Sequence, residues 1–476
     1  MYRSICSSML PNYLAGIEVQ AVFDEDTVPG LRLSNNSGRV GIMGQLLFGL
    51  GRRVITPPLG IELCGYGPYR ERKGTEVIQD LQCTALALST VGGTVFIWLS
   101  NDLIWLDRSI LEETYRLARS AYGLDASRIV ITNTHTHSGP ATMRTVAWGE
   151  WDQAYADTLP SLFVEAIGEA IGNMIPGRIG FSQVPVPELS VNRVEDDGPV
   201  EESASLIRID DMAGVMRAGV VNFSAHPVTL GATSHVCGDY VGDGVAKMEQ
   251  ALNERARILF FQGSCGNLNC RGFGSDIATM KANGSLLMDA ILPGLDDVST
   301  SSDVRLSGDS FEVALPMQVP ERGSLELELE ASDRALADFD GNPDSTVYKN
   351  LVYESEWRKL RLELLEGSHP ERKEIQVSYL QINDAVLVAH PLELFLEFGN
   401  IIREASPFAH TMLVGYANEA VGYLARPQDF RQEGFGWYAA VAAPRLCRHL
   451  EFAEEAGQVF CSHITALLHQ VFEKTE

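Results

Sequence analysis

The chain has 476 residues, of which 45% are hydrophobic and 21% are charged. This ordinary composition excludes a disordered protein, a collagen-like protein and a small disulfide scaffold. The formal net charge of −26 argues against binding to phosphate backbones and to anionic lipid headgroups, so we expect no nucleic-acid partner. Eight cysteines are too few for a disulfide framework and indicate reduced thiols in a cytoplasmic protein.

The first 40 residues form a poorly patterned leader segment that ends in turn-forming residues. The leader has no short apolar stretch followed by a small-residue cleavage site, and no run in the chain approaches ~18 apolar residues. We therefore expect neither a secretion signal nor a membrane span.

From residue 41 onward, apolar β-rich runs alternate with helix-periodic segments. Residues 91–105 and 128–132 have the pattern of strands, residues 108–124 that of a helix, and a further helix is expected at about 153–174. This order predicts an α/β fold in which helices cover a mixed β-sheet core.

Four of the expected strands end in small and polar residues. They are RIVIT before THTHSGP (134–140), AGVVNFSAHP (218–227), ARILFFQGSCGN (256–267) and DAVLVAHPLELF (384–395). In open α/β sheets, ligand sites lie outside the carboxyl ends of the strands. The sequence therefore places the candidate site at these strand ends.

Residues 321–370 are charged and helix-forming on both sides of the turn signal DGNPDS. They predict a helical hairpin inserted in a main domain that spans residues 41–440. This hairpin could be a solvated helix pair, a lid or a self-association arm. In the last case the protein could form a homo-oligomer. Residues 441–476 are expected to form a C-terminal helical tail.

The densest polar cluster is at the first of these strand ends, where His135 and His137 project to the same side of an extended chain. One imidazole can bind a metal while the other faces a substrate. His226 and Glu393 follow other strands, and imidazoles and a carboxylate that converge from separate strands typically hold catalytic zinc. There are two alternatives to this interpretation. His135 and His137 could be loop histidines whose hydrogen bonds are satisfied locally, and Glu393 could only stabilise the N-terminus of a helix.

Motifs for phosphate binding and for a serine nucleophile elbow are absent from the sequence. The candidate nucleophiles in a loop of suitable composition are Ser264, Cys265 and Cys270. A reactive cysteine needs a lowered pKa, which the sequence cannot show.

Three segments, ITNTHTHSGP (131–140), VNFSAHPVTL (221–230) and FFQGSCGN (260–267), with the weaker RVITPPLG and LCGYG (53–67), resemble the neutral/alkaline ceramidase family of zinc amidases. The resemblance implies that His135, His226, Glu393 and Tyr423 bind zinc. It also implies that His137 contacts the substrate carbonyl and its developing oxyanion.

The sequence departs from that family in three respects. Asn269 occupies the position of the family's catalytic serine, the continuation of the histidine motif reads GPATM (139–143), and we expect the chain to lack the secretory leader and C-terminal β-sandwich of the secreted members. We therefore expect a diverged member of the family whose ceramidase-like catalytic domain covers residues 41–440.

These observations predict a zinc-dependent hydrolase that cleaves a C–N amide bond of a small-molecule N-acyl or cyclic amide by metal-activated water. His137 and Tyr423 are expected to stabilise the oxyanion, Asn269 to orient substrate or water, and Asp239 to orient a histidine. Three alternatives stay open: an ester or lactone hydrolase, a covalent hydrolase that uses Ser264 or Cys265, and a non-catalytic ligand-binding member of the family.

Overall fold

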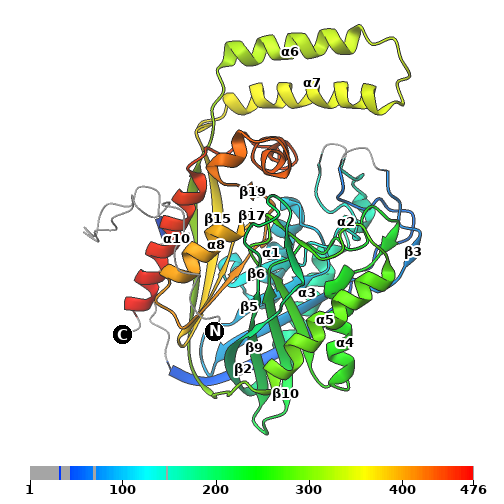
Figure 1. Cartoon of the computed structure of the whole chain (residues 1–476). Helices are drawn as coiled ribbons and strands as arrows, with labels where there is room; N and C mark the ends of the chain where they lie inside the picture. The colour runs from blue at the N-terminus through cyan, green and yellow to red at the C-terminus, as the bar shows by residue number, and fades with distance from the viewer. Residues whose placement is uncertain (1–31, 34–42, 68–70, 146–147, 475–476) are drawn as a thin grey trace, which may run out of the picture.

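The computed structural model of the protein describes residues 32–33, 43–67, 71–145 and 148–474. The expected leader over residues 1–40 lies outside the described residues, apart from β1 (Arg32–Leu33), which pairs with β14 (Asp303–Pro316). Figure 1 shows a body of strands flanked by helices, with one helical hairpin projecting from it.

The expected α/β fold with a mixed sheet is confirmed. The main sheet runs in the order β12-β10-β9-β7-β2-β14-β15-β16-β18, and β4, β5 and β6 branch from β2. The remaining strands of this sheet are β2 (Met43–Val54), β4 (Gln82–Thr90), β5 (Phe96–Asn101), β6 (Ile129–Asn133), β7 (Ile175–Pro185), β9 (Ser203–Asp211), β10 (Met216–Phe223), β12 (Arg257–Gln262), β15 (Arg372–Ile382), β16 (Ala385–Ala389) and β18 (His410–Val414). Three two-stranded ladders join β3 (Glu76–Val77) to β11 (His235–Val236), β8 (Ser190–Asn192) to β13 (Leu268–Cys270) and β17 (Leu392–Leu394) to β19 (Gly422–Leu424).

Helices cover the outer faces of the sheet in three groups. The first is α1 (Arg108–Tyr122) with α3 (Leu159–Gly172), the second is α4 (Asp239–Ala251) with α5 (Ile277–Asp296), and the third is α8 (Leu396–Ala405) with α10 (Ala456–Glu473). The inner faces of the strands form a further apolar core with one another. Strands such as β5, β6 and β16 are therefore buried along their whole length, which explains their continuous apolar sequences.

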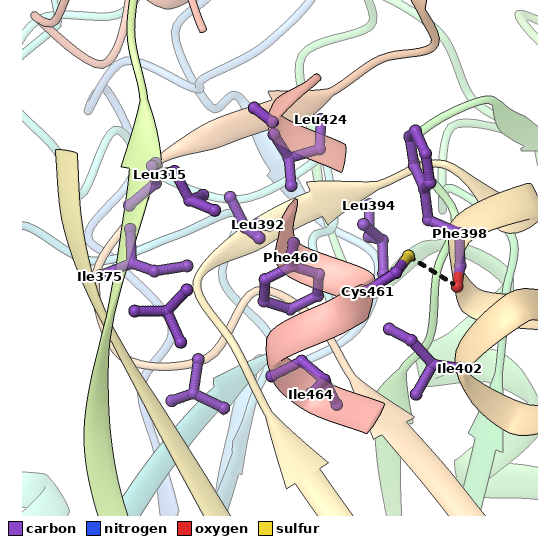
Figure 2. Close-up of a cluster of buried hydrophobic side chains, with 14 of the residues drawn as sticks. Leu315, Ile375, Leu392, Leu394, Phe398, Ile402, Leu424, Phe460, Cys461 and Ile464 are labelled. Carbon is purple, nitrogen blue, oxygen red and sulfur yellow. Dashed lines mark hydrogen bonds between the residues drawn. The ribbon is translucent and has the colours of Figure 1, made fainter. Parts of the chain in front are cut away.

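The third group contains the cluster drawn in Figure 2. Phe460 and Ile464 of α10 lie there among Leu392 and Leu394 of β17 and Ile402 of α8. The helical tail is thus part of the hydrophobic core. No helix in the described ranges is both long and apolar enough to cross a bilayer.

The helix expected at about 153–174 is split into α2 (Gln153–Ala156) and α3. Pro160 causes the break, because proline lacks an N–H and is accommodated in the first turn of a helix, where it lies in α3. The other short helical segments are η1 (Ala126–Arg128), η2 (Pro427–Phe430), α9 (Phe435–Trp437), the π-helical turn η3 (Tyr438–Ala442) and η4 (Ala443–Arg445).

The projecting hairpin consists of α6 (Arg322–Ala337) and α7 (Thr346–Leu365), which lie side by side (Figure 1). Ion pairs tie α7 to the body: Glu354 binds Arg445 at 2.5 Å, and Lys349 binds Glu71 at 2.6 Å. In α6, Leu325 is buried, whereas Leu327 is 67% exposed. The hairpin therefore contacts the body mainly through α7.

Three pairs of parallel strands bring their carboxyl ends together: β5 with β6, β10 with β12, and β16 with β18. The fully buried amide of Gln262, at the end of β12, links them. Its Nε2 donates to the carbonyls of Thr134 (3.1 Å) and Ala225 (3.0 Å), and its backbone carbonyl accepts from Gly415 N–H (2.9 Å). The side chain thus fixes the relative position of the segments that follow β6 and β10, and the backbone of the same residue holds the segment that follows β18.

We predict that Gln262→Glu lowers the free energy of unfolding by about 3 kcal/mol, because two buried carbonyls lose their donor and a charge enters a water-free position. Urea denaturation measures this change. Gln183→Glu, at an exposed position of β7, is the matched control and is expected to shift stability by no more than about 0.5 kcal/mol. Equal stability of the two variants would contradict the proposed role of Gln262.

Candidate metal and substrate site

The candidate site lies where these strand ends converge. His135 follows β6, His226 follows β10, and Glu393 lies in β17, which follows β16. Tyr423 lies directly opposite Glu393 in the parallel ladder of β17 and β19. Because paired residues in a ladder project to the same side, the register brings the carboxylate and the phenol together.

The side chains of three expected metal ligands meet within the protein. The distance from His226 Nε2 to Glu393 Oε2 is 3.3 Å, and that from His135 Nε2 to Glu393 Oε2 is 3.5 Å. His137 belongs to the same group, with its Nε2 3.3 Å from Nε2 of His135. Ligand atoms of all three histidines lie within 4.8 Å of one another, a cluster compatible with a metal site.

Backbone carbonyls determine which ring nitrogen of each histidine carries the proton. His135 Nδ1 lies 2.7 Å from the carbonyl of Ile104, and His226 Nδ1 lies 2.9 Å from that of Cys265. Since a carbonyl accepts hydrogen bonds only, both Nδ1 atoms are donors and both Nε2 lone pairs face Glu393. Three acceptors therefore converge on one point, an arrangement that a cation stabilises.

The pKa shifts at the site favour the protonation states that metal ligands require. Burial, with a contribution from the charge of Arg193, lowers the pKa of His226 to about 3, and burial lowers that of His137 well below its ordinary value. Burial alone would raise the pKa of Glu393, but its interactions and hydrogen bonds with His135 and His226 bring it below its ordinary value. His226 and His137 are thus neutral, and the carboxyl of Glu393 is ionised.

Several residues around the site have a left-handed backbone conformation, and two of these positions bear directly on its histidines. His135 has φ = +65°, a left-handed conformation that a residue with a Cβ adopts only when its surroundings impose it. Gly65, with φ = +100°, lies so close to the neighbouring imidazole that a Cβ would be 2.4 Å from His137 Nδ1. Only glycine fits there, and its absence of a side chain leaves room for the His137 ring.

Arg193, which sequence analysis missed, lies at the centre of the polar contacts. Its Nη1 donates to Asn269 Oδ1 (3.2 Å), and its Nη2 donates to the Gly266 carbonyl (2.7 Å) and to Tyr423 Oη (3.2 Å). Arg193 lies in a charged loop, where no pattern distinguishes it from a solvent-exposed arginine. The structure thus brings Asn269 and Tyr423 into one hydrogen-bonded group through a residue that no motif indicates.

Tyr416 is a second residue that sequence analysis missed. Its hydroxyl lies 3.5 Å from Glu393 Oε2 and 3.0 Å from Cys265 Sγ. A signal was available, because Tyr416 follows the apolar strand β18 as the other site residues follow their strands.

The candidate nucleophiles Ser264 and Cys265 are buried, and neither lines the cavity of the site. Burial raises the pKa of the Cys265 thiol, which therefore stays protonated at neutral pH. Cys270 is also buried, with a pKa raised to about 12 by burial. This arrangement does not favour the covalent alternative.

Asp239 lies elsewhere than expected. Its carboxylate accepts hydrogen bonds from the backbone N–H groups of Thr229 (3.2 Å), Leu230 (3.1 Å) and Tyr240 (2.7 Å), and no histidine is among its hydrogen-bond partners in the described part of the chain. The expected orienting contact to a histidine is thus not made, because backbone carbonyls hold the Nδ1 atoms. Asp239 instead fixes the loop that follows His226.

The site opens into a cavity of about 340 Å³ with mainly apolar walls. Glu393 and Arg193 are the charged side chains among the described residues that line it. Aromatic and aliphatic side chains form the remaining wall, among them Ile104, Trp105, Trp148, Val228, Phe273, Phe435, Tyr438 and Leu446.

Comparison with known proteins gives no match to a family model. Neutral ceramidase A of Dictyostelium discoideum is 27% identical over 265 residues, which cover 47% of this chain and 37% of that protein. Neutral ceramidase B of the same organism is 24% identical over 217 residues, which cover 40% and 30%. The matches thus span about a third of the length of these relatives.

Two solved structures share the fold. The neutral ceramidase from Pseudomonas aeruginosa matches with a TM-score of 0.66 and 17% identity, over 90% of this chain and 75% of that one. A ceramidase complexed with C2 matches with a TM-score of 0.65 and 16% identity, over 90% and 76%. The chain is therefore similar in sequence to the neutral ceramidases and has the neutral ceramidase fold.

Proposed function

We propose that this protein is a zinc-dependent hydrolase that cleaves a C–N amide bond. The observation that carries the proposal is the convergence of two imidazole lone pairs and a carboxylate, from His135, His226 and Glu393, at one end of a mainly apolar cavity. The curated relatives are named ceramidases, and a ceramidase hydrolyses an amide.

The residues present fit a zinc ion. Ligands placed 2.0–2.1 Å from a tetrahedral ion lie about 3.3 Å apart, and the two distances from Glu393 to the histidines are 3.3 Å and 3.5 Å. Two neutral imidazoles and a carboxylate are also a donor set that suits zinc. His135, His226 and Glu393 would hold the ion, with Tyr423 as a further ligand.

A bound zinc ion supplies Lewis-acid activation of the amide carbonyl and of water. The chain itself supplies donors for the oxyanion that develops on the carbonyl. Burial and the charge of Glu393 raise the pKa of Tyr423 well above its ordinary value, so an unliganded phenol remains a donor. His137 lines the cavity beside it and provides a second polar group.

Asn269 is not among the described residues that line the cavity, so it is proposed to orient the substrate through Arg193, whose Nη1 donates to its Oδ1. An asparagine cannot act as a nucleophile in place of the serine of the family pattern, so its contribution is limited to hydrogen bonding.

We predict that His135→Gln and His226→Gln each abolish the binding of stoichiometric zinc. His137→Gln should retain bound zinc and lower kcat by about 10²- to 10³-fold, because it removes only a group directed at the substrate. Elemental analysis and amide-release assays measure the two quantities. His469→Gln, on the outer helix α10, is the control and should change neither.

Two results would contradict this assignment. Loss of zinc from His137→Gln would make His137 a ligand and remove the need for Tyr423 in that role. Absence of zinc from the wild-type protein after purification and incubation with the ion would overturn the proposed function.

We predict that Asn269→Ala lowers kcat/KM by about tenfold, because Arg193, which lines the cavity, loses the acceptor that holds its Nη1. Ser264→Ala and Cys265→Ala should retain turnover within about threefold, since neither side chain lines the cavity. Steady-state kinetics on an N-acyl amide compare the three variants. Complete inactivation by Ser264→Ala or Cys265→Ala, with zinc content and folding unchanged, would instead support a covalent mechanism.

A further inference from the structure

The guanidinium of Arg193 lines the cavity without a carboxylate partner. No ion pair within 4.0 Å involves Arg193 among the residues that the structure describes. Its hydrogen-bond acceptors are neutral: the Gly266 carbonyl, the Asn269 amide, the Tyr423 hydroxyl and Nε2 of His226. In contrast, the nearby Arg426 binds acidic side chains only, those of Glu195, Glu397 and Asp429.

We infer that Arg193 binds a carboxylate of the substrate and that the substrate class is therefore the N-acyl amino acids. This inference rests on the proposed amide hydrolysis. The sole acidic side chain in the described cavity wall, Glu393, is already engaged by His135 and His226. A partly desolvated cation without a counterion is costly, and a carboxylate of the ligand offsets that cost.

The charge balance of the cavity favours an anion. Glu393 and Arg193 cancel, and the divalent ion proposed above leaves the site positive. The chain as a whole carries a formal net charge of −26, so an anionic ligand gains no general attraction to the surface. Attraction must come from the site itself, which makes Arg193 the determinant of specificity.

The position of Arg193 limits where the carboxylate can lie on the substrate. Its Nη2 is 3.1 Å from His226 Nε2, the atom proposed to hold the ion, and 3.2 Å from Tyr423 Oη. An anion bound to this guanidinium is therefore adjacent to the scissile carbonyl. The carboxylate of an N-acyl amino acid, one carbon from the amide nitrogen, meets this requirement.

The contact between Arg193 Nη2 and His226 Nε2 explains how Arg193 becomes available to donate to a ligand. A single lone pair on His226 Nε2 cannot serve both an N–H donor and a metal ion. Occupation of the lone pair by the ion frees the Nη2 hydrogen that now points at it. The freed donor faces the cavity, where it can bind a carboxylate.

The surroundings of Arg193 suit a planar anion attached to an apolar group. The guanidinium carbon lies 3.8 Å from the centre of the Phe435 ring, a contact that holds the planar fork in one orientation. A fixed guanidinium fork matches the geometry of a carboxylate. The apolar walls and the volume of about 340 Å³, at the lower end of ordinary ligand sites, accommodate an acyl chain or an amino-acid side chain.

The reaction is an ordinary hydrolysis. The oxygen of water forms a bond to the carbonyl carbon, the C–N bond breaks, and the nitrogen takes up a proton. The products are a carboxylic acid and a free amino acid, and no further reactant is required.

The test compares two amides that differ only in the carboxylate: N-octanoyl-phenylalanine and N-octanoyl-phenethylamine. The zinc-loaded wild-type protein is expected to hydrolyse the first with a kcat/KM at least about tenfold higher, since a charge-assisted hydrogen bond has about this effect. Arg193→Met should remove the preference by slowing the first substrate at least about tenfold more than the second. Arg431→Met, at an exposed arginine, is the matched control.

A binding measurement separates this inference from the proposed hydrolysis. Calorimetry with the non-cleavable amine N-octyl-phenylalanine in the presence of zinc should show binding to the wild-type protein that Arg193→Met weakens at least about tenfold. Arg193→Lys, which keeps the charge, should lose less. Removal of zinc should weaken the binding to the wild-type protein, because Arg193 Nη2 then points at His226 Nε2 again. If neither amide is hydrolysed but this pattern holds, the proposed function fails and the carboxylate site stands.

Other results would overturn the inference. Equal hydrolysis of both amides by the wild-type protein, or an equal loss on both with Arg193→Met, would leave amide hydrolysis standing and exclude carboxylate recognition by Arg193. Binding of the amine that is unaffected by Arg193→Met would exclude it as well. The wild-type substrate comparison decides the question even if Arg193→Met does not fold.

Discussion

The geometry of the candidate site depends on one hydrogen-bonded amide. Gln262 binds the carbonyl of Thr134, which precedes His135, and that of Ala225, which precedes His226. The two histidines come from strands that are not neighbours in the sheet, so their separation is not set by a shared ladder. Metal sites tolerate displacements of only about 0.2 Å. A rigid buried crosslink supplies this precision without contributing a ligand.

Burial determines the chemistry of the site as much as the choice of residues does. In water, the imidazoles would be partly protonated near neutral pH and would repel a cation. Inside the protein, desolvation keeps His226 and His137 neutral, while carbonyl acceptors fix the Nδ1 protons of His135 and His226. The backbone carbonyls thus orient these imidazoles as carboxylates do in many zinc sites.

The sequence allowed the strand ends and the residues on them to be predicted, because an apolar run that ends in small and polar residues is a local property. His135, His226 and Glu393 were found in this way, together with the motif resemblance, and the structure brings them together. Arg193 could not be found, because its role depends on which loop folds over the cavity. The partner of Asp239 was also wrong, since the backbone groups that orient the histidines have no signature in the sequence.

The helical hairpin has a consequence for the cavity that it does not itself line. Arg445, which ends η4, lies between Glu354 of α7 and the ring of Tyr353, whereas Ala443 and Leu446 beside it face the cavity. The substrate-facing wall is therefore braced from outside by an ion pair between η4 and the hairpin. Because the pair is partly buried, dissolved ions screen it much less than a pair at the surface. A charge on the hairpin thus bears on the shape of a largely apolar chamber through a single turn of chain.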